Sequence, residues 1–244
     1  MIPMLGDDAN EKIVEVRRKS AAWMVHALTA SGAVIGLLAL IAVIEGNPRE
    51  ALLWLGLALI VDGIDGPVAR KLDVAERLPR FDGALLDLVV DYLTYVVVPA
   101  VLLWQFEYLG DGWLASAAAG WILFSSLYIF ANLDLKTTDN YFVGFPAIWN
   151  IVALYIYVLG TPVWFNLTAV AVLGAFSFTK VKSIHPLRVR DYRALTLTAS
   201  GVWVFGATWL LWFAPAVNPI VLTAWMAASA WLVGLSLWRS VRGN

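Results

Sequence analysis

The sequence contains no cysteine and few charged residues, and both absences narrow what the chain can be. Without cysteine, disulfides, thiolate zinc sites and cysteine nucleophiles are all excluded. Charged residues make up 14 % of the 244 positions and hydrophobic residues 61 %, whereas a soluble domain is usually about 25 % charged and about 45–50 % apolar. A net charge of −1 argues against a nucleic-acid-binding protein. The composition instead indicates a membrane protein. Its 13 tryptophans are consistent with this, because tryptophan is enriched at membrane–water interfaces.

Long apolar segments between turn-forming residues predict an all-α, polytopic membrane protein. A helix needs about 20 mostly apolar residues to cross the bilayer, and no strand alternation typical of a membrane barrel is visible. Turn formers such as Gly46-Asn47-Pro48 and Gly110-Asp111-Gly112 separate the segments. The eight predicted spans cover residues 22–44, 51–72, 82–106, 112–131, 145–160, 162–179, 195–213 and 218–238.

The positions of the basic residues predict the orientation of these spans. If the N-terminus is cytoplasmic, all of the 17 lysines and arginines except Arg49 fall on the cytoplasmic side, as the positive-inside rule requires. Eight crossings then return the C-terminus to the same side. Residues 8–20 carry acids early and bases late, which predicts a short helix on the membrane surface. The whole chain, 1–244, is expected to form one domain.

Four carboxylates lie in the interior of predicted spans, where placing a charge costs free energy. Asp62 and Asp65 belong to the second span, and Asp87 and Asp91 to the third. Insertion of one such charge costs about 2.5–3.5 kcal/mol. The spacings i, i+3 and i, i+4 place each pair on one side of its helix. At about 1.5 Å per residue, both pairs lie roughly 9–15 Å from the cytoplasmic boundary. Because a short connection joins the two helices, we expect the four groups to meet.

Four acidic groups at one depth repel each other, which leaves two ways to stabilise them. Some can hold protons, or divalent cations can neutralise them, and all-oxygen ligands favour Mg²⁺, Mn²⁺ or Ca²⁺. Two such ions would form a phosphoryl-transfer site. A proton or cation pathway is the alternative function, although pathway carboxylates are usually spread through the membrane. A third interpretation is that the aspartates only stabilise helix packing.

The carboxylates belong to a longer motif. Residues 62–70 read D-G-I-D-G-P-V-A-R, and Gly83, Asp87 and Asp91 follow after a gap. This pattern resembles the signature of the CDP-alcohol phosphotransferase family, D-x2-D-G-x2-A-R followed by G-x3-D-x3-D, and every fixed position matches. Longer stretches, including FDGALLDLVVDYLTYVVVPA and NYFVGFPAIWN, resemble the bacterial branch of that family that uses choline.

The resemblance implies a fold and a reaction. A core of six spans would cover residues 22–180, and residues 195–238 would add two further spans. CDP-diacylglycerol and choline would give phosphatidylcholine and CMP, with two Mg²⁺ or Mn²⁺ ions in a cytoplasm-facing cavity. The resemblance also implies a homodimer. Within the family, the alcohol could instead be serine, inositol or glycerol phosphate. The alternative of another class is a cation- or proton-coupled transporter.

The resemblance also implies roles for individual residues. Asp62, Asp65 and Asp87 would hold the metals, and Asp91 would be the general base and a further ligand. The nucleotide site would include Asp62, Thr29, Gly66, Ala69, Arg70 and Gly83. His26 stands where related members have an asparagine near this pocket, so its role is open.

Recognition of choline and of the lipid phosphate is expected to involve further residues. A quaternary ammonium favours aromatic faces and sometimes an acid. The candidates for choline are Asp82, Tyr92, Tyr95 and Tyr141, although Asp82 could simply cap the third span. Lys182 and Arg188 lie in a basic segment that could bind the lipid phosphate. The combined expectation is a multi-pass protein of the bacterial inner membrane with its active site and both termini on the cytoplasmic side.

Overall fold

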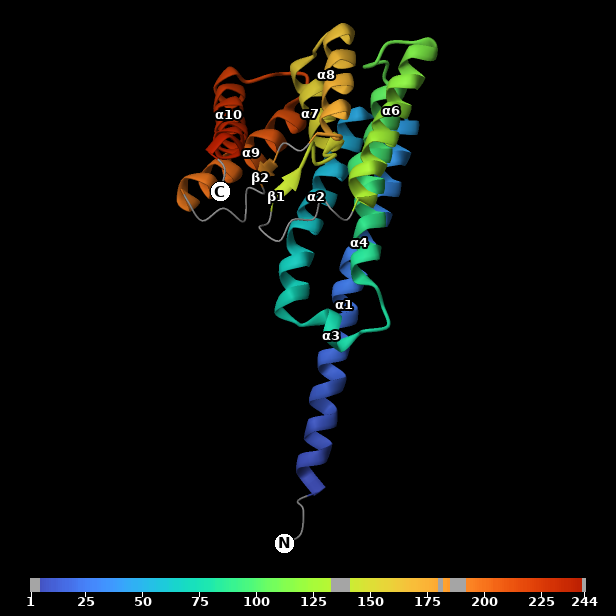
Figure 1. Ribbon diagram of the computed structural model, residues 1–244, viewed down its shortest axis with the longest axis vertical. Helices are drawn as coiled ribbons and strands as arrows, with labels where there is room; N and C mark the ends of the chain where they lie inside the picture. Colours follow the sequence, from blue (N-terminus) through green and yellow to red (C-terminus); the bar gives the residue numbers. More distant parts are fainter. Residues whose placement is uncertain (1–4, 133–140, 180–181, 185–191, 243–244) are drawn as a thin grey trace.

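The computed structural model of the protein describes residues 5–132, 141–179, 182–184 and 192–242, and these are almost entirely helical (Figure 1). The elements are α1 (Leu5–Ile44), α2 (Pro48–Lys71), α3 (Val74–Arg77), α4 (Gly83–Asp91), the π-helix η1 (Tyr92–Val97), α5 (Val98–Gln105), α6 (Gly112–Ala131), β1 (Tyr141–Val143), α7 (Trp149–Leu159), α8 (Val163–Phe176), β2 (Lys182–Ile184), α9 (Arg193–Phe213) and α10 (Pro219–Arg242).

The all-α, polytopic architecture is confirmed. Each of the eight predicted spans contains an apolar helix or, for the third, a chain of consecutive helices. Among the described residues, five helical segments are long and apolar enough to cross a membrane, and the others are shorter. The five segments are Asn10–Ile44, Pro48–Lys71, Gly83–Gln105, Gly112–Ala131 and Arg193–Phe213.

Helix α1 corrects the expectation of a separate surface helix at residues 8–20. These residues are helical, but they continue without a break into the first span, and residues 10–20 are exposed. Neither glycine nor proline occurs between Gly6 and Gly32, so nothing in the sequence ends the helix. At 40 residues, α1 is about 60 Å long, roughly twice the hydrocarbon thickness. Its N-terminal end therefore projects beyond the other helices (Figure 1).

The fifth predicted span also needs correction. The fifth span was predicted at residues 145–160, but α7 has only 11 residues, or about 16 Å of helix. Positive φ at Gly144 and Ala147 keeps the preceding segment out of a helix. The chain also contains a short antiparallel ladder in which Tyr141 of β1 pairs with Ile184 of β2. This ladder satisfies the backbone of two connecting segments that lie outside or at the ends of helices.

Close packing of α1 against the α4–η1 segment sets the geometry of the molecule's interior. A Cβ on Gly32 would lie 2.5 Å from Val90 Cγ1, and one on Gly36 would lie 2.9 Å from Leu93 Cδ2. These two glycines, four residues apart, let the helix backbones approach as small residues do in membrane bundles. Because α1 also packs along α2, it braces both helices that carry the aspartates.

Helices α9 and α10 attach to the core through a partly buried polar contact. Tyr155 of α7 shares a hydrogen bond with Ser229 of α10 and accepts one from Trp203 Nε1 of α9 at 2.8 Å. The Tyr155 ring also stacks on Trp225, with centroids 4.3 Å apart. The two C-terminal helices are therefore joined to α7 by hydrogen bonds as well as by apolar packing.

Candidate active site

Three aspartates from α2 and α4 converge in space. Asp62 of α2 and Asp87 and Asp91 of α4 each offer a carboxylate oxygen, and these three oxygens all lie within 4.8 Å of one another. All three side chains are half-buried. The donor set consists only of hard, anionic oxygen atoms, which fits a divalent cation such as Mg²⁺ or Mn²⁺. We call Asp62, Asp87 and Asp91 the aspartate cluster.

The fourth aspartate of the motif makes a different contact. Asp65 is buried, with 5 % of its surface exposed, and its Oδ2 accepts a hydrogen bond from Thr29 Oγ1 of α1 at 2.6 Å. Thr29 was expected near the nucleotide, and the structure places it against the motif itself. The structure thus brings three aspartates together and ties the fourth to α1.

Tyr95 contributes a contact that the sequence did not suggest. Its hydroxyl donates to Asp62 Oδ2 at 2.6 Å, so the tyrosine reaches from η1 to a member of the aspartate cluster. From its sequence position, Tyr95 was expected only to offer an aromatic face to choline. The available signal was that Tyr95 lies only four residues after Asp91 in the sequence.

Four of the predicted nucleotide residues lie near the loop end of the same hairpin, where α2 ends and α4 begins. Arg70 Nη1 lies 3.4 Å from where a Cβ on Gly66 would be, so the guanidinium folds back over that glycine. Ala69 packs against the buried cluster that includes Val25 of α1. At the start of α4, a Cβ on Gly83 would lie 2.6 Å from His26 Cε1. His26 is therefore pressed against the first turn of α4.

Of the other residues predicted to contact choline or the lipid phosphate, the structure describes the side chains of Asp82 and Tyr92. Asp82 caps α4, because its Oδ1 accepts from the backbone N–H of Leu85 at 2.9 Å. Tyr92 faces α6, where its hydroxyl donates to the carbonyl of Leu123 at 3.1 Å. Arg188 lies outside the described residues, and the side chains of Tyr141 and Lys182 also lie outside the described part.

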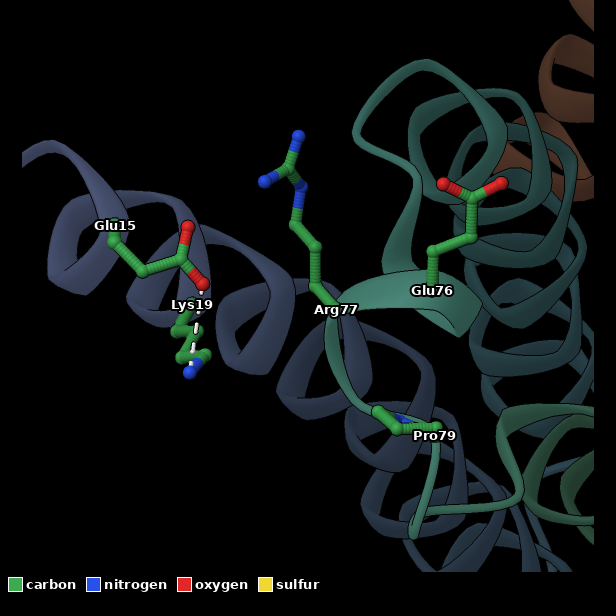
Figure 2. A pocket seen from close by; sticks show the side chains of 5 residues that line it. All are labelled: Glu15, Lys19, Glu76, Arg77 and Pro79. Atoms are coloured by element: carbon green, nitrogen blue, oxygen red, sulfur yellow. Dashed lines mark ion pairs between the residues drawn. The ribbon is translucent and has the colours of Figure 1, made fainter. Parts of the chain in front are cut away.

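A shallow hollow lies apart from the aspartate cluster, where α1 passes the α3 corner (Figure 2). It has a volume of about 450 Å³ and mixes acidic and basic side chains. Glu15 and Lys19 form an ion pair on α1 at 3.4 Å, and Arg77 pairs with Asp73 at 3.5 Å. A second hollow of about 300 Å³ shares Arg77 and is lined by Arg17, Arg18 and Lys71 as well. This end of the molecule is thus rich in cationic side chains.

Comparison with known proteins assigns the chain to a family. The family model described as CDP-alcohol phosphatidyltransferase matches residues 23–181. The chain is similar to a protein of Pseudomonas aeruginosa named phosphatidylcholine synthase, with 51 % identity over 92 % of this chain and 94 % of that protein. Proteins of the same name from Mesorhizobium japonicum and Borreliella burgdorferi are 43 % and 38 % identical over 78 % and 72 % of this chain, and over 70 % and 75 % of their own lengths.

The match includes the whole motif and the aspartate cluster, and it extends beyond the family segment into the C-terminal helices. The chain therefore belongs to the CDP-alcohol phosphatidyltransferase family.

Proposed function

We propose that the protein transfers the phosphatidyl group of CDP-diacylglycerol to choline and releases CMP. The observation that carries the chemistry is the aspartate cluster, whose three oxygens lie within 4.8 Å of one another at the α2–α4 hairpin. The choice of choline rests on the relatives named phosphatidylcholine synthase, one of them 51 % identical along 92 % of this chain. Membership of the family favours group transfer over the transport alternative.

Members of this family generally use a divalent metal, and the cluster has suitable donors. Asp62, Asp87 and Asp91 would hold Mg²⁺ or Mn²⁺, and Asp65 would contribute to a second ion. Bound metal supplies positive charge that stabilises the diphosphate and the departing CMP. Because Tyr95 and Thr29 already hydrogen-bond to Asp62 and Asp65, both carboxylates are oriented before substrate arrives.

Asp91 is proposed as the general base. The choline hydroxyl is a weak nucleophile, and a carboxylate within hydrogen-bond reach can take its proton as the new bond forms. The choline oxygen then bonds to the lipid-side phosphorus, and the bond from that phosphorus to the bridging oxygen of the diphosphate breaks. The electron pair leaves with CMP, and the proton stays on Asp91 until it passes to water.

The position of the hairpin suits a lipid substrate. The acyl chains of CDP-diacylglycerol remain in the bilayer while its diphosphate reaches the aspartates just below the surface. Arg70 offers a planar donor fork for a phosphate, and Gly66 and Gly83 allow close approach of the nucleotide. For choline, an aromatic face such as Tyr141 stays a prediction, and Lys182 and Arg188 stay predicted contacts of the lipid phosphate.

The setting of the enzyme is part of the proposal. The cationic side chains near α3 lie at the same end of α2 and α4 as the aspartates, which supports a cytoplasmic active site in the bacterial inner membrane. A homodimer is proposed from the family resemblance, and cross-linking of the purified protein in nanodiscs tests it. A protein that stays monomeric under those conditions contradicts the dimer.

A CMP-release assay on the purified protein in nanodiscs tests the reaction. We expect CMP from CDP-diacylglycerol only with choline and with Mg²⁺ or Mn²⁺, and no release in EDTA. Serine, inositol and glycerol 3-phosphate, offered in turn, test the alcohol, and exclusive use of serine would refute the choice of choline. Ion or proton flux in proteoliposomes without CMP release would refute the transfer reaction.

A further inference from the structure

The third span changes its winding directly after Asp91. Residues Tyr92–Val97 form a π-helix, and the N–H of Val98 donates to the carbonyl of Leu93, five residues earlier. Pro99 explains the change, because it has no N–H for the carbonyl of Tyr95 and its ring would clash with that carbonyl in a regular α-helix. Such π-turns are rare and are frequently found at functional sites.

The wider turn sets the direction of the Tyr95 side chain. An α-helix places 3.6 residues in a turn, and the i to i+5 bonding of a π-helix places more. Tyr95 is therefore rotated relative to Asp91 compared with its direction in a regular helix. In this position it faces α2, and its hydroxyl donates to Asp62 Oδ2 at 2.6 Å.

The hydrogen bond itself is of the strong kind. An O–H donor and a carboxylate acceptor at 2.5–2.7 Å form a charge-assisted bond. Only 7 % of the Tyr95 surface is exposed, so water does not replace the contact easily. With Oδ2 engaged by the phenol, Asp62 has Oδ1 and one remaining lone pair of Oδ2 to offer to a cation.

We propose that Tyr95 is a positioning residue that sets the metal affinity of the aspartate cluster by fixing the Asp62 carboxylate. The inference rests on the proposed metal site and adds a residue to it. Groups that hydrogen-bond to a metal ligand typically change metal affinity 10- to 100-fold when they are removed. Tyr95 thus acts through Asp62 and does not touch the reacting atoms.

Tyr95→Phe tests this role, because it removes the hydroxyl and keeps the ring. Binding of Mn²⁺ to the purified protein in nanodiscs is measured from the electron paramagnetic resonance signal of the free ion. We expect the dissociation constant to rise about 10-fold. Tyr155→Phe is the matched control, because it also removes a hydroxyl hydrogen-bonded between helices, away from the aspartates. It should lower thermal stability and leave Mn²⁺ affinity unchanged.

A mutant cycle separates positioning from a general effect on the fold. In an Asp62→Ala background the added Tyr95→Phe change should have no further effect on Mn²⁺ affinity, because its target is gone. In the CMP-release assay, Tyr95→Phe should need more Mn²⁺ for half-maximal rate and recover most of its rate at saturation. If Tyr95→Phe does not fold, 3-fluorotyrosine at position 95 keeps the ring and donates more strongly, so it should hold Asp62 at least as well and bind Mn²⁺ no more weakly than the wild type. Weaker Mn²⁺ binding would contradict the positioning role.

The outcomes distinguish the inference from the proposed function. Equal Mn²⁺ affinity in the wild type and Tyr95→Phe, or an undiminished effect of Tyr95→Phe without Asp62, overturns the positioning role. A wild-type protein that releases CMP yet does not bind Mn²⁺ overturns the metal site on which the inference rests. A wild-type protein that binds Mn²⁺ and shows no CMP release contradicts the proposed reaction alone.

Discussion

The contact between His26 and Gly83 allows a quantitative prediction about α4. A Cβ on Gly83 would lie 2.6 Å from His26 Cε1 and 3.2 Å from Nδ1, whereas carbon atoms pack at about 3.5–4.0 Å. The ring cannot swing away freely, because it is 8 % exposed and lies against Phe81 with centroids 4.4 Å apart. In Gly83→Ala the start of α4 must therefore move by about 1 Å relative to α1.

That displacement reaches the aspartate cluster, because Asp87 lies one turn further along α4. A misplacement of about 1 Å in an active site can lower the rate about 100-fold. We expect a loss of this order for Gly83→Ala in CMP release at saturating substrates, with the protein still inserted and folded. Gly56→Ala is the control, since no heavy atom lies within 4 Å of the added Cβ, and it should remain near wild type.

A second substitution tests whether the clash is the cause. Shortening His26 to alanine removes the ring that the new Cβ meets, so the double variant His26→Ala/Gly83→Ala should be within about tenfold of His26→Ala alone. The reasoning fails if Gly83→Ala keeps normal turnover. It also fails if the double variant shows the full 100-fold loss relative to His26→Ala, because the glycine would then be needed for substrate and not for space.

Substitutions at three further residues test the other contacts of the site. Asp91→Asn should reduce CMP release at least 100-fold without changing thermal unfolding, as loss of a general base predicts; normal turnover would rule out that role. Thr29→Val leaves the buried carboxylate of Asp65 without its donor and should destabilise the protein by about 1–3 kcal/mol in reversible unfolding, while Thr29→Ser should not. Asp82→Ala should cost about 1 kcal/mol as a lost helix cap, and Asp82→Asn much less; equal loss of choline-dependent rate in both would point instead to the charge.

Sequence alone predicted the helices well wherever turn formers bound an apolar segment. The fourth span, 112–131, agrees with α6 because Gly110-Asp111-Gly112 marks its start and its composition is apolar throughout. The fifth does not agree, because Ala147 has a positive φ, and an alanine in the sequence does not indicate that conformation. The first span was predicted to start at residue 22, since hydropathy marks where the membrane begins but not where a helix begins.

The candidate site was predictable in its residues and less so in its contacts. Motif spacing and depth correctly placed Asp62, Asp87 and Asp91 together. The partners Thr29 and Tyr95 depend on how each helix is rotated about its axis, which composition does not reveal. For Tyr95 that rotation also depends on a π-helix, whose cause, Pro99, lies four residues later and is visible only in retrospect.

The hydrogen bonds of Tyr155 to Trp203 and Ser229 bear on where this protein can be divided. The recognisable family segment ends at residue 181, which would suggest that the last two helices are a removable appendix. In hydrocarbon, however, a tyrosine hydroxyl that loses its hydrogen-bond partners has no water with which to replace them. We therefore expect the catalytic part and its C-terminal extension to unfold in a single cooperative transition. The end of the family segment is then not a boundary between independently folding units.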